Sequence, residues 1–257
     1  MKNWLKVRLI SYIFVLAAIF DPIIETMNEL NNLSNSLELT IKDTDLQNVT
    51  IDLAETITDS FLSEGIGRDI PIFGTIVGLA KSAMNLKDRL FIKKLIYFLI
   101  NLNSIPKNKR EEMIVQIDSS DKYKIKVGEK LIYIIDKCED HKSAEKVGKL
   151  FHAFLNGSIS YSEFLRGATI IDKIFFEDLE FFLSENIETL QKVETWNDDP
   201  LSDFQHRLVN AGLFSSSIDP VTVEDQDDWK MTDKYVVRGG KASVYLTEIG
   251  SILKMYL

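Results

Sequence analysis

IGRDIPIFGTIVGLAKSAMNLKDRLFIKKLIYFLINL, residues 66–102, is the stretch around which the rest of the chain is arranged. No charged residue occurs from position 70 to position 80, and Lys81 is the only charge between Asp69 and Lys87. A run this apolar has to be covered by the rest of the protein, by a partner or by lipid. The choice among these three decides which function the sequence predicts.

The first half of the stretch predicts a helix with Asp69 as its N-cap and Pro71 in its first turn, where the missing proline N–H costs little. Gly74 and Gly78 form a G-x-x-x-G spacing, which lets two helix backbones approach closely in a membrane span. Glycines in a buried helix of a soluble protein have the same packing role. The spacing therefore leaves both environments open.

The second half, 90–102, leaves little polar face, and Phe91 and Phe98 are among its apolar residues. A helix that is apolar nearly all round is a central core helix, or one that meets lipid or a partner. Basic side chains flank and interrupt it at Lys87, Arg89, Lys93 and Lys94. Such residues are attracted to anionic lipid head groups, and they pair equally well with acidic segments of a soluble protein.

The amino-terminal segment, residues 1–22, has a basic start and then an uncharged run that includes Leu9, Phe14 and Phe20. Three interpretations remain open: a buried or oligomer-facing helix, a membrane-associated helix, and a cleaved signal. Twelve residues at ~1.5 Å each rise about 18 Å, which is short of a bilayer core of about 30 Å. A full membrane span by this run alone is therefore disfavoured.

The charge distribution, the cysteine count and the absence of catalytic motifs limit the classes of function that the sequence supports. The net charge is −9, but residues 61–110 hold nine basic and three acidic side chains, so the apolar centre is the positive part of an acidic protein. The single Cys138 excludes an internal disulfide framework. No P-loop, G-x-S-x-G, H-E-x-x-H or paired C-x-x-C motif occurs. We therefore expect a protein that is not an enzyme and that uses no cofactor and no metal.

The middle of the chain predicts a helical bundle. Apolar residues recur at helical spacing in 122–138 and in 142–155, and Gly157 provides a stop. Ser160 and Glu163 match a capping box, and the helix that they start has apolar positions at helical spacing as far as Phe182.

Nearer the amino terminus, Leu37, Leu39 and Ile41 alternate with polar residues. This period of two predicts a short extended piece.

The last part of the chain, 195–257, predicts an α+β tail. A short helix ends at Gly212, a hairpin over 235–245 turns at Gly239-Gly240, and Thr247 caps a final helix. The sequences LVNAGLF (208–214) and VYLTEIGSILKMYL (244–257) resemble the end of winged-helix domains, where a helix, a two-stranded wing and a last helix follow in that order.

Winged-helix domains raise the question of nucleic acid. The candidate contacts in this tail are Arg207, Arg238 and Lys241. The tail has ten acidic and six basic residues, whereas a DNA-binding surface needs several bases against phosphate. Nucleic acid is therefore the less favoured partner, and a protein contact or a structural role is favoured.

Three stretches, DIPIFGTIVGLAKSAMNLKDRLFIKKLIYFL (69–99), KSAEKVGKLFHAFLNGSISYSEFLRG (142–167) and LVNAGLF with YLTEIG in the tail, resemble uncharacterised bacterial helical proteins. These include the abortive-infection alpha type, found among phage-defence genes. The resemblance implies a role in bacterial defence, as a membrane-damaging effector held inactive by a partner. It carries over no functional residue.

We expect a mainly α protein: an apolar amino-terminal helix in 1–22, a helical bundle in 23–194 and a winged-helix-like tail in 195–257. The leading hypothesis is a non-enzymatic, homo-oligomeric defence effector at the inner membrane, in contact with anionic lipid and a regulatory protein. The alternative is a soluble, cytoplasmic helical regulator or scaffold whose tail contacts a protein or nucleic acid.

Overall fold

The computed structural model describes residues 23–42, 45–50, 53, 69–80, 84–190, 193–194, 201–225 and 235–257. The protein is mainly α-helical, with small antiparallel sheets near the carboxyl end, which confirms the predicted helical fold with a small α+β tail. The chain divides into two compact units, Met1–Lys137 and Cys138–Leu257. The division falls inside 23–194, the stretch that the sequence predicted as one bundle.

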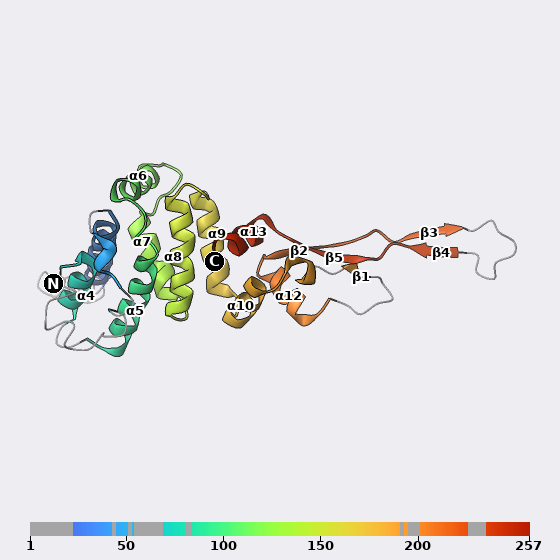
Figure 1. Ribbon diagram of the computed structural model, residues 1–257, viewed down its shortest axis with the longest axis horizontal. Coiled ribbons are helices and arrows are strands. Elements are labelled where there is room, and N and C mark those ends of the chain that lie inside the picture. The colour runs from blue at the N-terminus through green and yellow to red at the C-terminus, as the bar shows by residue number, and fades with distance from the viewer. Residues whose placement is uncertain are drawn as a thin grey trace, which may run out of the picture. The chain divides into compact units, whose positions relative to one another are not determined.

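Helices dominate the described part of the first unit (Figure 1). An α-helix covers residues 23–42. The labelled elements that follow are the 3₁₀ turn η1 (Leu46–Asn48) and the helices α4 (Pro71–Leu79), α5 (Leu86–Ile100), α6 (Lys107–Asp118) and α7 (Val127–Lys137).

The helix over 23–42 contains the three residues for which the sequence predicted an extended piece, so that prediction is wrong. Leu37 and Ile41 are fully buried, whereas Leu39 is 49% exposed. The two buried residues are four apart, and residues at this spacing lie on one face of a helix. The alternation in the sequence therefore arises because Leu37 and Ile41 lie on the buried face of the helix, while Leu39 between them is an apolar residue on its exposed side.

This helix also organises its neighbours. The hydroxyl oxygen of Thr40 accepts a 3.1 Å bond from the backbone N–H of Ile72, in the first turn of α4. That bond replaces the cap predicted at Asp69, because the N-cap position is Ile70, which has no side-chain cap; Pro71 is the first helical residue, as predicted. Satisfying an orphan N–H from another helix fixes both the start and the position of α4.

The apolar centre is largely interior to the first unit. In α5, Ile92, Leu95 and Phe98 have no solvent exposure. In α4, Ile72 and Phe73 are equally buried. Basic residues of α5 remain at the boundary with solvent, where a long side chain can cover apolar surface with its methylenes while its charge stays hydrated.

The second unit begins with two packed helices, α8 (His141–Leu155) and α9 (Tyr161–Lys173). Gly157 adopts φ 77° between them, and Ser158 N–H donates to Ala153 O at 2.9 Å, a glycine-ended helix as predicted. The capping box of Ser160 and Glu163 is also present. Phe151 and Phe164 pack edge to face across the pair with ring centroids 5.1 Å apart.

The helix that starts at Ser160 ends earlier than the apolar spacing predicted. Ile174 and Phe175 are extended, and a new helix, α10 (Phe176–Ser184), begins after them, followed by the short α11 (Ile187–Leu190). Glu177 and Asp178 lie in the first turn of α10, where acidic side chains favour a helix N-terminus. One predicted helix is therefore two.

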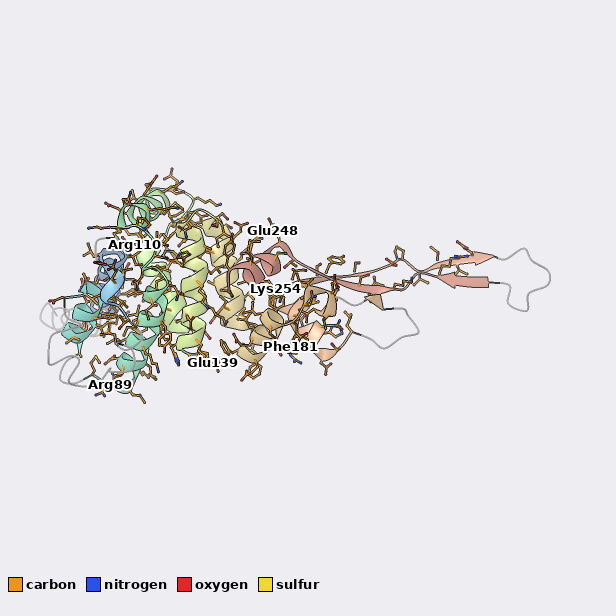
Figure 2. All side chains as sticks on the ribbon, viewed as in Figure 1. Arg89, Arg110, Glu139, Phe181, Glu248 and Lys254 are labelled. Carbon is orange, nitrogen blue, oxygen red and sulfur yellow. The ribbon has the colours of Figure 1, made fainter. Side chains whose placement is uncertain are left out.

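The last helix, α13 (Glu248–Tyr256), is capped by Thr247 as predicted and closes this unit. Its Lys254 (Figure 2) donates three bonds to the carbonyl oxygens of Phe182 (2.6 Å), Leu183 (3.0 Å) and Glu185 (2.6 Å) at the end of α10. An ammonium has three donors, so all are used. Burial lowers the pKa of Lys254, and the charge of Glu185 opposes this shift.

The remaining described elements of the second unit are β1 (Val193–Glu194), just before the tail, and α12 (Asp203–Asn210), β2 (Phe214–Ile218), β3 (Thr222–Asp225), β4 (Tyr235–Arg238) and β5 (Ala242–Leu246) within it. β5 lies between β1 and β2 in one sheet, and β3 pairs with β4 in the other, all antiparallel. Gly212 has φ 85° after α12, which confirms the predicted end of that helix. The winged-helix likeness of the tail stays a prediction.

The predicted hairpin over 235–245 is wrong, because β4 pairs with β3 and β5 pairs with β2. Gly239 and Gly240 have φ 89° and 75°, and the two strands cross beside them (Figure 1). A Cβ on Gly239 would lie 1.9 Å from the carbonyl oxygen of Pro220. The glycines therefore permit a close backbone crossing within a longer hairpin.

Two glycines of the first unit provide a matched stability test. A Cβ on Gly128 in α7 would lie 2.5 Å from the Ser34 carbonyl oxygen, whereas a Cβ on Gly78 in α4 meets nothing within 4 Å. We expect Gly128→Ala to lower the free energy of unfolding by about 1–3 kcal/mol, through overpacking against backbone. We expect Gly78→Ala to raise it by up to about 1 kcal/mol, through helix propensity.

Urea denaturation of both variants checks this pair. A stabilising Gly128→Ala, or a Gly78→Ala that destabilises as much as Gly128→Ala, would contradict the packing described for the first unit.

Candidate functional site

The residues predicted to pack helices or meet a membrane have different environments. Leu9, Phe14 and Phe20 lie outside the described residues. Phe98 is fully buried, and Phe91, Pro71 and Gly74 are half-buried. Gly78 is exposed, with open space where its side chain would be, so only part of the G-x-x-x-G pair contacts protein within the described residues.

The basic flank of α5 borders a small exposed apolar surface. Leu86 is 71% exposed and Leu90 is 52% exposed, one helical turn apart. Lys87 is exposed beside them, and Arg89 and Lys93 are half-buried. Lys94 is also half-buried, and its Nζ donates to the carbonyl oxygen of Asp136 at 3.0 Å. Among the described helices of the chain, none combines the length and the apolar character that a membrane crossing needs.

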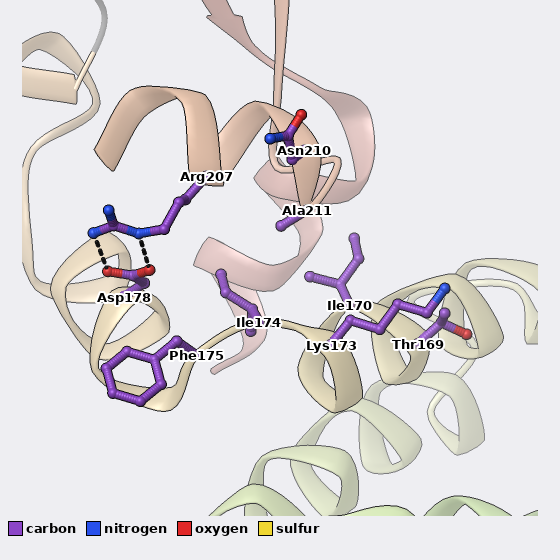
Figure 3. Close-up of a pocket in the computed structure, with 9 residues that line it drawn as sticks. All are labelled: Thr169, Ile170, Lys173, Ile174, Phe175, Asp178, Arg207, Asn210 and Ala211. Atoms are coloured by element: carbon purple, nitrogen blue, oxygen red, sulfur yellow. Dashed lines mark hydrogen bonds and ion pairs between the residues drawn. The ribbon is translucent and has the colours of Figure 1, made fainter. Parts of the chain in front are cut away.

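A pocket of about 440 Å³ lies in the second unit among α9, α10 and α12 (Figure 3). Ile170, Ile174 and Ala211 form its apolar part. Its polar lining is Thr169, Lys173, Asp178, Arg207 and Asn210, and Phe175 stands at its side with 61% of its surface exposed.

The pair formed by Asp178 and Arg207 dominates the electrostatics of this pocket. Arg207 Nε donates to Oδ2 at 2.6 Å and Nη2 donates to Oδ1 at 2.9 Å, so the pair is bidentate. The hydrogen bond from Arg207 lowers the pKa of the Asp178 carboxyl, although burial of Asp178 opposes the shift. The same bond raises the pKa of Arg207. The pair ties α10 to α12, which makes it a structural clamp.

The three predicted nucleic-acid contacts are not brought together into a basic surface. Arg207 is held by Asp178, and Arg238 Nε lies 2.9 Å from a Glu224 carboxylate oxygen. Lys241 is exposed, and its carbonyl oxygen accepts a bond from the N–H of Asp219. Because two of the three cations are paired with carboxylates, the charge left for phosphate is small.

A second pocket, of about 500 Å³ in the first unit, is lined by parts of η1 and by the start of α6. Arg110 lines it and is only 3% exposed, which is unusual for arginine. Burial lowers the pKa of Arg110, and the charge of Asp45 opposes this shift. The sequence identified Arg110 only as one of the bases near the apolar centre. Its burial depends on tertiary packing, which leaves no local pattern.

The sequence also missed a group of exposed apolar residues near the carboxyl end of the second unit. We call β2, β3, β4 and β5, with the residues 219–221 and 239–241 that join them, the β-arm. Ile218 is 72% exposed, Val221 is 61% exposed and Val223 is 63% exposed. The alternation of valine with polar residues in 221–224 was the one sequence signal for this strand.

The β-arm is one hairpin with a single register. Ile218 pairs with Ala242 at the end of β2, and continuing that pairing across the crossing places Thr222 opposite Arg238, the pair observed in β3 and β4. Its base is fixed because Phe214 and Val244 are buried and Phe214 packs edge to face on Phe182. The strongest packing of the outer section, β3 and β4, is between its own two strands within the described part of the chain.

Among the described residues, no group of three or more His, Cys, Asp or Glu side chains is arranged to hold a metal ion. Comparison with known protein families, with curated proteins and with solved structures finds no match to this chain. Any conclusion about function therefore has to be drawn from the sequence and structure of this chain.

The clamp between α10 and α12 predicts a pH dependence. Because the pKa of Asp178 is lowered in the folded protein, its stabilising effect is complete above the ordinary aspartate pKa of about 4, and is lost as the pH falls through the folded value. Arg207→Gln should lower the urea midpoint at pH 7. The difference from the parent protein should shrink toward zero as the pH falls below the folded pKa of Asp178.

Lys173→Gln is the matched control, because Lys173 lines the same pocket outside the Asp178–Arg207 pair. Its urea midpoint should differ from the parent by a constant amount over the same pH range. A pH-independent difference for Arg207→Gln would show that the ion pair does not contribute to stability.

Proposed function

We propose that this protein is a non-enzymatic helical scaffold or regulator that binds another protein through the β-arm. The observation that carries the proposal is the exposure of Ile218, Val221 and Val223 along the β-arm. Single exposed apolar side chains are ordinary on a protein surface. Three within six residues of one hairpin, two of them on alternate positions of the same strand segment, are typical of an interaction surface.

The energetics of a two-stranded ribbon support this role. An isolated hairpin is at best marginally stable in water, and stability normally requires a third strand or a covered apolar face. Fully covering one valine or isoleucine contributes about 1.5–3 kcal/mol. A partner that covered the arm would therefore contribute both binding free energy and order to the outer section.

Protein is favoured over nucleic acid by the charges of the arm. A β-ribbon can enter a DNA groove, but it then needs cations toward the phosphates. Here Glu224 and Asp225 lie in β3, and Glu224 takes up Arg238 as an ion-pair partner. An apolar protein surface matches the arm better than a phosphate backbone does.

The register of the arm gives a direct test. Ile218 and Ala242 are cross-strand partners, so residues 219–241 can be replaced by Asn-Gly, which forms a two-residue hairpin turn. The shortened variant should fold with a free energy of unfolding within about 1 kcal/mol of the parent, because the removed strands pair with each other and the buried base of the arm at Phe214 and Val244 is kept.

With parent and shortened chains as baits in source-cell extract, quantitative mass spectrometry should find binding proteins that the parent retains and the shortened chain loses. Equal recovery of every protein by the two baits would overturn the proposed function. Circular dichroism of both chains verifies that the helices are retained.

A second candidate function is a defence effector that acts on the inner membrane, as the resemblance to abortive-infection proteins implies. One observation favours it: Leu86 and Leu90 are exposed one helical turn apart, beside Lys87 and Lys93. Exposed leucines with neighbouring lysines are typical of helices that lie in the interface of anionic membranes. Such contact needs no membrane-spanning helix.

Vesicle flotation tests this second candidate. The parent chain should bind phosphatidylglycerol vesicles in a salt-sensitive manner. Leu86→Gln with Leu90→Gln should weaken binding about a hundredfold, since each buried leucine contributes about 1.5 kcal/mol or more. Leu39→Gln is the control, because Leu39 is similarly exposed on a different helix. Absence of binding by the parent, or equal loss in the control, would remove the membrane role of α5.

A further inference from the structure

Helix α9 has one face in the core of the second unit and one face toward solvent. Phe164, Ala168 and Ile171 lie on the core face and are buried. The other face lines two neighbouring depressions, which share Thr169 and Ile170. We call the two depressions together the α9 groove. The α9 residues that line it recur at the spacing of one helical face: Ser162, Leu165, Arg166, Thr169, Ile170 and Lys173.

The floor of the α9 groove is apolar. Beside the 440 Å³ pocket already described lies the second depression, of about 380 Å³, where Leu165 and Ile249 stand next to Ile170. Gly212 also borders this depression, and a Cβ on Gly212 would lie 3.9 Å from Ile170 Cδ1. The absence of a side chain at this position leaves room over Ile170. Depressions of this size and lining are typical of sites that accept an apolar group.

Two cations stand along the α9 groove. Arg166 lines one depression and Lys173 lines the other, seven residues further along α9, so at ~1.5 Å per residue they are about 10 Å apart. The side chain of Lys173 extends along α9 beside Thr169, away from the pair of Asp178 and Arg207 (Figure 3). Within the described part of the chain, neither Arg166 nor Lys173 forms an ion pair with a carboxylate.

The acids close to the α9 groove are engaged elsewhere. Among the described residues that line it, Asp178 is the single acid, and both of its oxygens accept bonds from Arg207. Glu163 lies one turn before Arg166, but its Oε2 accepts a 2.6 Å bond from the Ser160 N–H. That bond is the main cause of the lowered pKa of Glu163, and the charge of Arg166 contributes less. Positive charge is therefore left on the groove for an anion from outside.

We propose that the α9 groove binds a peptide segment of another protein that carries one large apolar side chain between two carboxylates. The apolar side chain sits over Ile170, and the carboxylates meet Arg166 and Lys173. This site is separate from the β-arm, because no residue from 219 to 241 lines it. The two proposals therefore stand or fall independently.

The placement of the cations favours a peptide over other anions. A small anion satisfies only one of two cations that are about 10 Å apart, whereas a peptide with two acidic side chains satisfies both. Nucleic acid needs several cations along its phosphates, and it gains little from an aliphatic floor. Exposed ion pairs add only modestly to affinity, so the apolar side chain supplies most of the binding and the charges select the sequence.

Selection from a phage-displayed library of random dodecapeptides on the immobilised full chain tests this inference. The enriched peptides should have a large apolar residue with Asp or Glu on both sides. In an extended peptide the two acids should be three residues apart, because three residues at ~3.3 Å span about 10 Å. Replacing the apolar residue of the best peptide by Ser should weaken its binding at least about tenfold.

Charge reversal on the protein locates the binding. Fluorescence anisotropy of the best peptide, labelled with fluorescein, should show binding about tenfold weaker to Arg166→Glu and to Lys173→Glu than to the parent, because attraction becomes repulsion. Lys142→Glu is the matched control, since it changes the net charge equally at an exposed position of α8 outside the groove. Its affinity should stay within about twofold of the parent, because screening weakens distant charges. Circular dichroism verifies that all three variants are folded.

The inference is overturned if no peptide is enriched, if the enriched peptides lack acids, or if all three charge reversals weaken binding equally. The chain with the shortened β-arm should bind the selected peptides as the parent does. Loss of peptide binding on shortening would assign these peptides to the β-arm and refute the groove. Retained peptide binding together with equal protein recovery in the extract experiment would support the groove and refute the function proposed for the arm.

Discussion

One antiparallel register, from Phe214 opposite Leu246 to Asp225 opposite Tyr235, determines what the carboxyl-terminal half of this protein presents to solvent. β5 is the central strand of the inner sheet, so its position is fixed on both sides. A shift of one residue would exchange the two faces of the whole hairpin. Burial of Phe214 and Val244 resists that shift, and so the buried base decides which residues of the outer section are displayed.

The crossing at Pro220 and Gly239 separates the buried base from the exposed section. Proline has no N–H to give to the ladder, and it sits where the ladder is interrupted. Gly239 and Gly240 take left-handed backbone conformations that let the strands pass at close range. The ladder resumes beyond them in the same register. Glycine here allows the two strands to cross at close range while they keep one register.

The parts of the fold that the sequence predicted are those set by neighbours along the chain. The capping box at Ser160, the helix end at Gly157 and the cap at Thr247 each involve residues within a few positions of one another. The predictions that failed needed a distant partner. Leu37 and Ile41 are helical next to α4 and α7, and Gly239 is required by the close backbone of Pro220, on the other side of the hairpin.

The candidate site was harder to predict for the same reason. The valines in 221–224 indicate a strand. Which strand pairs with it cannot be read locally, because its partner β4 follows only after nine further residues. The apolar centre gave the opposite difficulty. Its composition suited a core helix and a lipid contact equally, and only tertiary packing shows that Ile92, Leu95 and Phe98 are interior while Leu86 and Leu90 are not. The composition of a segment gives the amount of apolar surface, but only the tertiary packing determines which part of that surface is exposed.

The β-arm also has to avoid uncontrolled strand addition, since a two-stranded ribbon has open edges on both sides. Charged residues in edge strands discourage pairing with other chains, and β3 carries Glu224 and Asp225 while β4 ends at Arg238. These charges protect the edges and leave the exposed side chains of Val221 and Val223 uncovered. Pairing through backbone groups is thereby hindered, and packing through side chains remains open. A ribbon with charged edges and exposed valines is suited to a reversible, side-chain-mediated contact, and poorly suited to growth of a continuous sheet.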